Sequence, residues 1–159
     1  MIPIHTERLF LRAFRPDDVD DLVELDSDPA VMEFLGGFPP KTREDAAEWI
    51  EFLHRTYSGN RGFWVAEENG RFIGWFHLRP AKDTGETELG YRLRKDAWGR
   101  GLATEGGQAL IGLAGERVIA RTMITNQRSR RVMEKLGMSP VREFLYDDRL
   151  PCVEFATNP

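Results

Sequence analysis

One stretch of the sequence combines glycines, an arginine and a hydroxyl side chain in an order that suits a bound anion. Residues 93–105 predict the end of a strand, a loop and the start of a helix. The first N–H groups of a helix lack intrahelical acceptors, and the helix dipole adds about half a positive charge. Gly99 and Gly101 let an anion approach the backbone, while Arg100 adds charge and Thr104 a hydroxyl. The spacing predicts a pyrophosphate site; the alternative is a helix start whose glycines only shape a turn.

The elements around this stretch predict a mixed α/β domain. Strand segments alternate with period two, helical segments repeat apolar residues at spacings of three and four, and Asn69-Gly70 marks a hairpin. The expected strands are residues 6–14, 63–67, 71–79, 86–94, 118–125, 141–146 and 151–156. The expected helices are residues 17–25, 28–36, 42–57, 102–114 and 127–136. This order predicts helices flanking one sheet that is antiparallel early and contains a parallel crossover later.

Length and composition bound the class of protein. The chain has 159 residues, 41% hydrophobic and 30% charged, so we expect one globular domain over residues 1–159. Its apolar runs are too short to span a membrane. Cys152 is the only cysteine, which excludes an intrachain disulfide and a cysteine-based zinc site, and the three histidines lack metal-ligand spacing. We therefore expect a soluble, cytoplasmic protein without a metal.

Charge is distributed unevenly along the chain. The net charge of −4 argues against a nucleic-acid binder. Residues 1–59 carry 13 acidic and 6 basic side chains, whereas residues 60–159 carry 13 acidic and 16 basic ones. The difference has two interpretations: chance among solvated helix faces, or a cation bound near the first part and an anion on the second.

Four motifs along the chain resemble one family. Residues 98–105 resemble the acyl-CoA pyrophosphate loop of the GNAT superfamily of N-acetyltransferases, in the variant typical of RimJ/RimL-type ribosomal-protein N-terminal acetyltransferases. Residues 6–12, 88–91 and 126–138 resemble that group's opening strand, central strand and second CoA-contacting segment. The resemblance covers nearly the whole chain. It implies the α/β GNAT acyl-CoA acyltransferase fold, with a central mixed seven-stranded sheet flanked by helices.

The resemblance also implies a site for acetyl-CoA. The strand that ends at Leu93 and Arg94 is expected to part from its neighbour, so that its backbone binds pantetheine and polarises the thioester carbonyl. Asn126 and Ser129 are expected beside the pantetheine arm. The loop amides expected to hold the CoA diphosphate are those of Gly99, Arg100, Gly101, Ala103 and Thr104. Three arginines are candidates for the 3′-phosphate: Arg128, Arg130 and Arg131.

The implied reaction is direct transfer of an acyl group to an amine. An ammonium cannot attack a thioester, so a base or a water relay must take its proton. Glu88 is the candidate base, because the family often places a carboxylate in this strand; Glu86 shares its face, and a solvated edge is the alternative for both. Met133 replaces the family's usual tyrosine acid and is expected in the core, so Ser129 or a bound water is the candidate proton donor.

The sequence indicates the acceptor less specifically than the donor. An amine, either a small molecule or a protein N-terminus, is expected in a cleft beside the acidic first helices. Six side chains are candidates to line this cleft, although each also suits a core: Phe34, Phe38, Trp64, Trp75, His77 and Tyr91. Two alternatives stay open, a transferase that uses succinyl-CoA and an acyl-CoA-binding regulatory module without catalysis. The late strands 141–146 and 151–156 are plausible edges for a homodimer.

Overall fold

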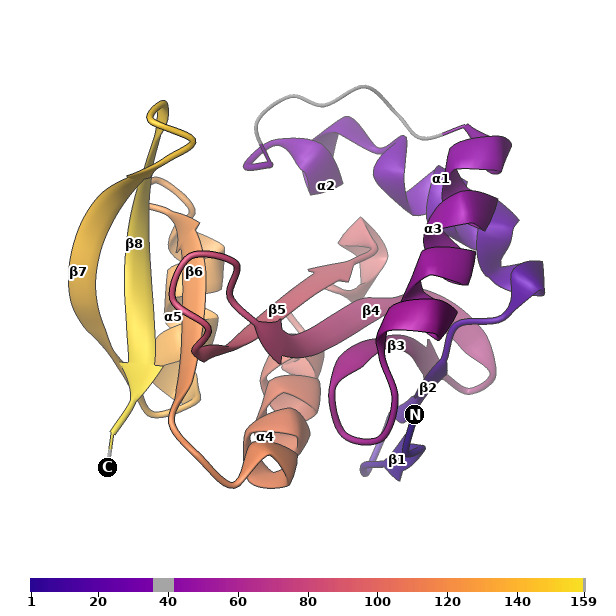
Figure 1. Ribbon diagram of the computed structural model, residues 1–159, viewed down its shortest axis with the longest axis horizontal. Helices are drawn as coiled ribbons and strands as arrows, with labels where there is room; N and C mark the ends of the chain where they lie inside the picture. Colours follow the sequence, from indigo (N-terminus) through magenta and orange to yellow (C-terminus); the bar gives the residue numbers. More distant parts are fainter. Residues whose placement is uncertain (36–41, 159) are drawn as a thin grey trace.

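One eight-stranded sheet organises the protein (Figure 1). The computed structural model describes residues 1–35 and 42–158. The strands lie in the order β1-β2-β3-β4-β5-β6-β8-β7. Their bounds are Ile4–His5 (β1), Phe10–Ala13 (β2), Gly62–Glu68 (β3), Arg71–Pro80 (β4), Thr87–Leu93 (β5), Val118–Met123 (β6), Met138–Tyr146 (β7) and Leu150–Thr157 (β8). All seven expected strands are present, and the eighth is the two-residue β1, which pairs with the start of β2.

Helices cover both faces of this sheet (Figure 1). One face carries α1 (Val19–Asp26), α2 (Pro29–Met32) and α3 (Arg43–Thr56), and the other carries α4 (Leu102–Ala114) and α5 (Gln127–Lys135). Two 3-10 turns, η1 (Pro16–Asp18) and η2 (Lys95–Ala97), precede α1 and the α4 loop. Within residues 1–35 and 42–158, no helix is long and apolar enough to cross a membrane.

Local signals explain where several elements begin. Thr42 and Asp45 form a capping box at the start of α3, in which each side chain accepts a hydrogen bond from the other residue's N–H. Asn69 and Gly70 have φ of 51° and 77°, as a two-residue turn between β3 and β4 requires. The expected hairpin and the expected start of α3 are therefore confirmed.

Apolar side chains form two main clusters, one on each face of the sheet. Leu89 and Leu93 of β5 pack in one cluster with Leu110 of α4, whereas Leu22 of α1 and Ile50 of α3 belong to the other. Side chains alternate between the two faces along a strand. The odd-numbered residues of β5 therefore face α4, and the even-numbered residues, including Glu88, face the opposite side.

The parallel strands β5 and β6 separate after a short contact. Thr87 pairs with Val118 and Glu88 with Ile119, and the pairing ends there. Beyond this point β5 stays beside β4 up to Leu93, while β6 pairs with β8. The sheet thus opens into a V whose apex is at Glu88, as the resemblance implied. In the described part of the chain, no strand pairs with this edge of β5 beyond Glu88.

Candidate functional site

The start of α4 presents free backbone donors at the mouth of the V. Gly99 and Gly101 have φ of 73° and 79°, a left-handed region that favours glycine. The first bond of the helix runs from the Glu105 N–H to the Gly101 carbonyl oxygen at 3.0 Å. The N–H groups of residues 102–104 therefore point out of the helix end. Together with the helix dipole, they form an anion site of the predicted kind.

Arg100, predicted at this site, uses its side chain elsewhere. Its guanidinium binds both carboxylate oxygens of Glu68 in β3, at 2.8 and 2.5 Å. This bidentate pair is the kind that fixes geometry as well as charge. The Arg100 side chain therefore anchors the loop to β3, and its backbone N–H is the group left for an anion.

A second arginine lies over the loop without a carboxylate partner. The Arg128 guanidinium stacks on the Trp98 ring, 3.5 Å from its centroid, and Trp98 donates to the Leu93 carbonyl at 3.0 Å. Among the described residues, no carboxylate pairs with Arg128. Arg130 instead donates to the Ile124 carbonyl at 2.9 Å. Of the three candidate arginines, the structure places Arg128 against the loop.

The open edge of β5 carries the backbone groups of its odd-numbered residues. Arg94 N–H donates to the Ile73 carbonyl at 2.7 Å, and antiparallel pairs alternate between bonded and non-bonded positions. Hence the N–H and C=O groups of residues 88, 90 and 92 point to β4. Those of residues 89, 91 and 93 point into the V.

Leu93 is therefore placed as predicted, but Arg94 is not. The Arg94 N–H is bonded to Ile73, and its carbonyl accepts from the Ala97 N–H at 2.9 Å. Its guanidinium donates to Glu24 at 2.7 Å and to Asp21 at 2.8 Å. Arg94 holds α1 against the sheet, and its prediction as a cofactor residue is corrected on this ground.

The other wall of the V is the start of α5. The Asn126 side chain caps the helix by accepting from the Ser129 N–H at 3.2 Å. The Ser129 hydroxyl in turn lies 3.0 Å from the Tyr91 hydroxyl of β5. Ser129 therefore contacts β5, and Asn126 caps the same end of α5.

Tyr91 takes the core alternative and not the acceptor cleft. The sequence left both open, and its odd number places its side chain on the α4 and α5 side. Burial raises the pKa of its hydroxyl, against the hydrogen bond with Ser129. The hydroxyl is thus held protonated beside Ser129. The alternation of Leu89, Tyr91 and Leu93 was the signal that indicated this side.

Met133 packs in the core, as expected. It is 3% exposed and belongs to the cluster between the sheet, α4 and α5. A thioether there fills space and donates no proton.

Glu88 lies at the apex of the V, on the face away from α4. It is 9% exposed, and its carboxylate lies 3.1 Å from Arg79, 3.7 Å from Arg121 and 3.8 Å from His77. Burial raises its pKa, although both arginines act in the opposite direction. Glu86, in contrast, lies outside β5 and forms an ion pair with Arg117. The two carboxylates thus have different environments.

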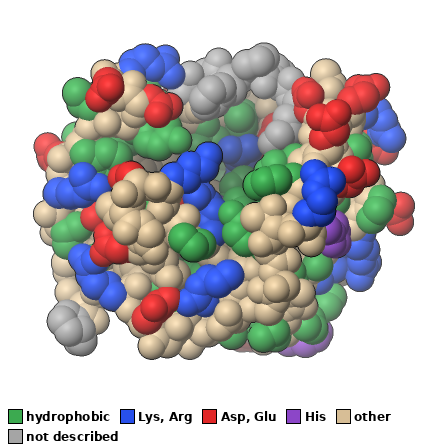
Figure 2. Space-filling view, viewed as in Figure 1, with side chains coloured by type: hydrophobic (Ala, Val, Ile, Leu, Met, Phe, Trp, Pro, Cys, Tyr) green, Lys and Arg blue, Asp and Glu red, His purple; other side chains and the backbone are tan. Residues whose placement is uncertain are grey.

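The charges around Glu88 continue across the sheet. Arg121 of β6 binds Glu154 of β8 and Asp83, each at 2.9 Å, and Arg142 of β7 binds Glu154 at 3.1 Å. We call these residues, together with Arg79 and Glu88, the cross-sheet network. Figure 2 shows basic side chains on the floor of the hollow between the two halves of the molecule. The network is charge-balanced, with three arginines and three carboxylates.

His77 lies beside Glu88 and is neutral. Its Nδ1 lies 3.2 Å from the Glu88 carbonyl oxygen, which only accepts, so Nδ1 carries the proton. Burial, followed by the charge of Arg79, lowers the pKa of His77 to about 3. A β-carbon on Gly90 would lie 2.2 Å from Nε2, so the ring needs glycine there. Neutral His77 leaves the Glu88 charge uncompensated on that side.

The other candidate cleft residues divide between core and surface. Trp64 is fully buried in the α4-side cluster. Trp75 lies in an aromatic group with His77 and Phe63, whose centroids are 5.0 to 6.0 Å apart. Phe34 is half-buried after α2, and Phe38 lies outside the described residues.

The acidic first helices use much of their charge in ion pairs. Asp18 binds Arg12, Asp21 binds Arg94 and Asp26 binds Arg92, at distances of 2.6 to 2.8 Å. The expected attraction of a cationic amine by this wall is correspondingly weakened. The acidic excess in the sequence therefore serves the fold at these positions.

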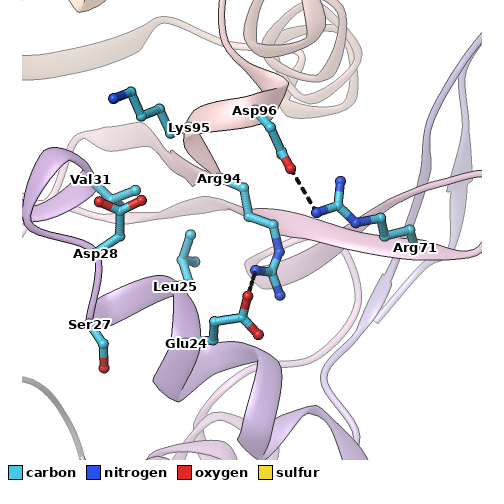
Figure 3. Close-up of a pocket in the computed structure, with 9 residues that line it drawn as sticks. All are labelled: Glu24, Leu25, Ser27, Asp28, Val31, Arg71, Arg94, Lys95 and Asp96. Atoms are coloured by element: carbon cyan, nitrogen blue, oxygen red, sulfur yellow. Dashed lines mark hydrogen bonds and ion pairs between the residues drawn. The ribbon is translucent and has the colours of Figure 1, made fainter.

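An open groove of about 640 Å³ lies between α1, α2 and η2 (Figure 3). Four of its charged side chains form ion pairs with one another, Arg94 with Glu24 and Arg71 with Asp96. None of Glu88, Asn126 and Ser129 lines this groove. We therefore assign the site to the V between β5 and β6, which has free backbone donors of the α4 start at its mouth and the buried carboxylate of Glu88 at its apex. Among the described residues, no group of three His, Cys, Asp or Glu could hold a metal.

Known proteins with related sequences and structures identify the family. Residues 8–139 match the family described as Acetyltransferase (GNAT) domain. The FsC-acetyl coenzyme A-N(2)-transacetylase of Aspergillus fumigatus is 32% identical over 168 residues, covering 95% of this chain and 72% of that protein.

Solved structures agree in fold. An acetyltransferase of the GNAT family from Bacillus anthracis has a TM-score of 0.81 at 24% identity, covering 98% of this chain and 97% of that one. RimL, a ribosomal α-N-protein acetyltransferase in complex with coenzyme A, has a TM-score of 0.79 at 18% identity, with the same coverage of 98% and 97%. From these matches and the geometry above, the chain belongs to the GNAT family and is an acetyltransferase.

Proposed function

We propose that this protein transfers an acetyl group from acetyl-CoA to a primary amine. The observation that carries the proposal is the presence of three features along one V in the sheet. These are the free amides before and within the first turn of α4, the open backbone edge of β5, and Glu88 at the apex. Two relatives support the choice of donor: the Aspergillus protein is an acetyl coenzyme A transacetylase, and RimL was solved in complex with coenzyme A.

The residues at the V fit coenzyme A. A diphosphate needs N–H donors and close approach, and a β-carbon at Gly99 would meet no atom within 4 Å. The amides of Arg100, Gly101, Ala103 and Thr104 complete the proposed cradle. Pantetheine carries amide groups, for which Leu93 and Asn126 supply backbone and side-chain partners. Bound acetyl-CoA would supply an activated acetyl group and a thiol leaving group.

Glu88 is the proposed base. Its raised pKa makes it a better proton acceptor than an exposed glutamate, and it lies where β5 and β6 part. Arg79 and Arg121 disfavour a further positive charge beside it. An amine entering there is therefore held neutral after its proton leaves, either directly to Glu88 or through water.

Ser129 is the proposed donor to the leaving thiolate. Its hydroxyl lies 3.0 Å from that of Tyr91, so a proton given up by Ser129 can be replaced from Tyr91. Both groups lie on the α4 and α5 side of β5, whereas Glu88 lies on the other. The arrangement separates proton acceptance from proton donation across the strand.

The acceptor is proposed as a primary amine of a small molecule or of a protein N-terminus. The N-terminal α-amine follows from the RimJ/RimL resemblance, and the N(2)-transacetylase name of the Aspergillus relative supports transfer to a nitrogen. The homodimer remains a prediction, as does the cytoplasmic location. Of the two late strands expected at an edge, β7 lies at one edge of the sheet, whereas β8 lies between β6 and β7.

Thiol release tests the proposal. Acetyl-CoA and succinyl-CoA are offered with polyamines, amino acids, aminoglycosides and short peptides. We expect amine-dependent thiol release with acetyl-CoA, reduced in Glu88→Gln and retained in the matched control Glu86→Gln. Faster thiol release with succinyl-CoA would show that succinyl-CoA, and not acetyl-CoA, is the acyl donor. Coenzyme A binding without release for any amine would favour a regulatory module, and no binding at all would overturn the proposal.

A further inference from the structure

Arg8 connects the N-terminal segment to the loop before α4. Its Nη1 donates to the Arg100 carbonyl at 2.7 Å, and its Nε donates to one oxygen of Glu105 at 2.8 Å. The other Glu105 oxygen accepts from the Arg8 N–H at 2.8 Å and from the Thr6 hydroxyl at 2.6 Å. The segment that contains Thr6 and Arg8, before β2, is thus hydrogen-bonded to the first turn of α4.

Glu105 is the fixed point of this contact. Its side chain is 15% exposed. Burial raises its pKa, but hydrogen bonds from Thr6 and from the Arg8 backbone and guanidinium outweigh this, so its pKa is lowered. Glu105 therefore stays charged and orients the Arg8 guanidinium, whose Nη1 reaches the Arg100 carbonyl in the loop.

Because of the geometry of a peptide unit, the contact between Arg8 and the Arg100 carbonyl affects the orientation of an N–H group at the anion site. In a trans peptide, the C=O and the following N–H point in opposite directions. The Arg100 carbonyl is held toward Arg8, so the Gly101 N–H points away from it. Gly99 and Gly101 flank Arg100, and glycines let a peptide turn over at low cost. Turned over, this unit would present its carbonyl oxygen to the anion.

We infer that Arg8 is a positioning residue that keeps the peptide between Arg100 and Gly101 turned with its N–H toward the CoA diphosphate. The inference rests on the proposed use of acetyl-CoA. Glu68 holds the Arg100 side chain from β3, so the carbonyl is the part of Arg100 that Arg8 controls. Arg8 thereby restricts the backbone conformation of a loop that its two glycines would otherwise leave free to change.

The test compares a donor that has the diphosphate with one that lacks it. In Arg8→Gln, we expect the KM for acetyl-CoA to rise about tenfold, the effect of one lost charge-assisted hydrogen bond, with kcat unchanged. The kcat/KM for S-acetylpantetheine should not change, since it has no diphosphate. Arg71→Gln is the matched control: Arg71 is also exposed and ion-paired, with Asp96 at 2.8 Å, but holds no loop carbonyl.

Two further measurements separate positioning from other roles. Arg8→Lys keeps the charge but loses the fork, so it should not restore the KM; full restoration would show that charge alone matters. Amide hydrogen exchange of residues 98–104 in the free protein should be faster in Arg8→Gln than in the wild type or Arg71→Gln. Unchanged exchange, or equal losses with both donors, would overturn the inference. If the wild type fails to bind coenzyme A, the proposed function fails instead.

Discussion

The cofactor loop and the cross-sheet network are built in different ways. The loop before α4 offers backbone N–H groups, which come from consecutive residues and depend on two left-handed glycines. The network around Glu88 consists of side chains from β4, β5, β6, β7 and β8 and of Asp83 in the loop before β5, joined by ion pairs. The backbone site thus depends on one short segment of the sequence. The side-chain site forms only when five strands pair in the correct register.

The difference also separates binding from chemistry. A loop of amides recognises a diphosphate and should affect donor affinity. Glu88 lies on the opposite face of β5 and should affect turnover. Variants on the two sides should therefore divide between KM for the donor and kcat.

The largest effect should come from Glu88→Gln. The variant keeps shape but cannot accept a proton, and general-base catalysis contributes about 10²- to 10⁴-fold. We expect kcat to fall by at least about a hundredfold at saturating donor, with the affinity for coenzyme A unchanged. The rising limb of the pH–rate profile, which the raised pKa of Glu88 places above the usual glutamate range, should disappear.

Glu86→Gln is the control for that measurement, because Glu86 pairs with Arg117 outside β5. Thermal unfolding of both variants separates catalysis from stability, since Arg79 loses a charged partner in Glu88→Gln. An unaltered pH profile in Glu88→Gln would remove Glu88 as the base.

Gly101→Val should weaken donor binding at the loop before α4. A β-branched residue at φ of 79° is strained, and its side chain would crowd the Arg8 guanidinium, whose Nη2 lies 3.4 Å from a β-carbon built at this position. We expect the Kd for coenzyme A, measured by calorimetry, to rise about a hundredfold, or roughly 2.7 kcal/mol. Gly115→Val is the matched control, because Gly115 has φ of 64° at the far end of the same helix. Equal affinity losses in both variants would indicate strain alone.

A smaller effect should come from the pair of hydroxyls. Ser129→Ala and Tyr91→Phe should each lower kcat about tenfold, because each removes a link in the proposed proton path. The double variant should lose little more than either single one, since the two hydroxyls act together. Fully additive losses in this double-mutant cycle would show that the hydroxyls act independently. The stability of each variant is checked by denaturant unfolding.

The smallest effect concerns pH and stability around His77. Unfolded histidine takes up a proton below about pH 6.5, whereas His77 stays neutral down to about pH 3. The unfolded state therefore binds more protons in this window. The free energy of unfolding should fall by about 1.4 kcal/mol per pH unit as pH drops through it.

His77→Gln should remove that part of the slope when denaturant unfolding is measured from pH 7 to pH 4. His5→Gln is the control, because His5 is an exposed histidine that stacks on Phe10 at the sheet edge. Equal slopes in wild type and His77→Gln would show that His77 is protonated in the folded protein.

Prediction from the sequence succeeded where the signal was local. The hairpin at Asn69-Gly70, the start of α3 at Thr42 and the helix after Gly101 each follow from neighbouring residues. It was less successful where partners are distant. Arg94 was expected to serve the cofactor, yet Asp21 and Glu24 of α1 hold its side chain.

The site residues show the same division. The candidate amides and Ser129 were assigned from motifs; in the structure the amides begin α4, and Ser129 contacts Tyr91 of β5. For Tyr91 the sequence left the cleft and the core open, and the structure packs it against the core. The contact between Arg8 and the α4 loop had no signal in the sequence, because 97 residues separate Arg8 from Glu105.

The sequence by itself determined the order of elements, the glycine loop and the residue types available for chemistry, since these depend on neighbouring residues and on periodicity. Only the tertiary structure decided which charges are free. Arg100 is neutralised by Glu68, Arg94 by α1, and Glu88 is buried between two arginines. Burial and pairing depend on strand register and on contacts between distant segments, and these set the pKa and the reach of each group.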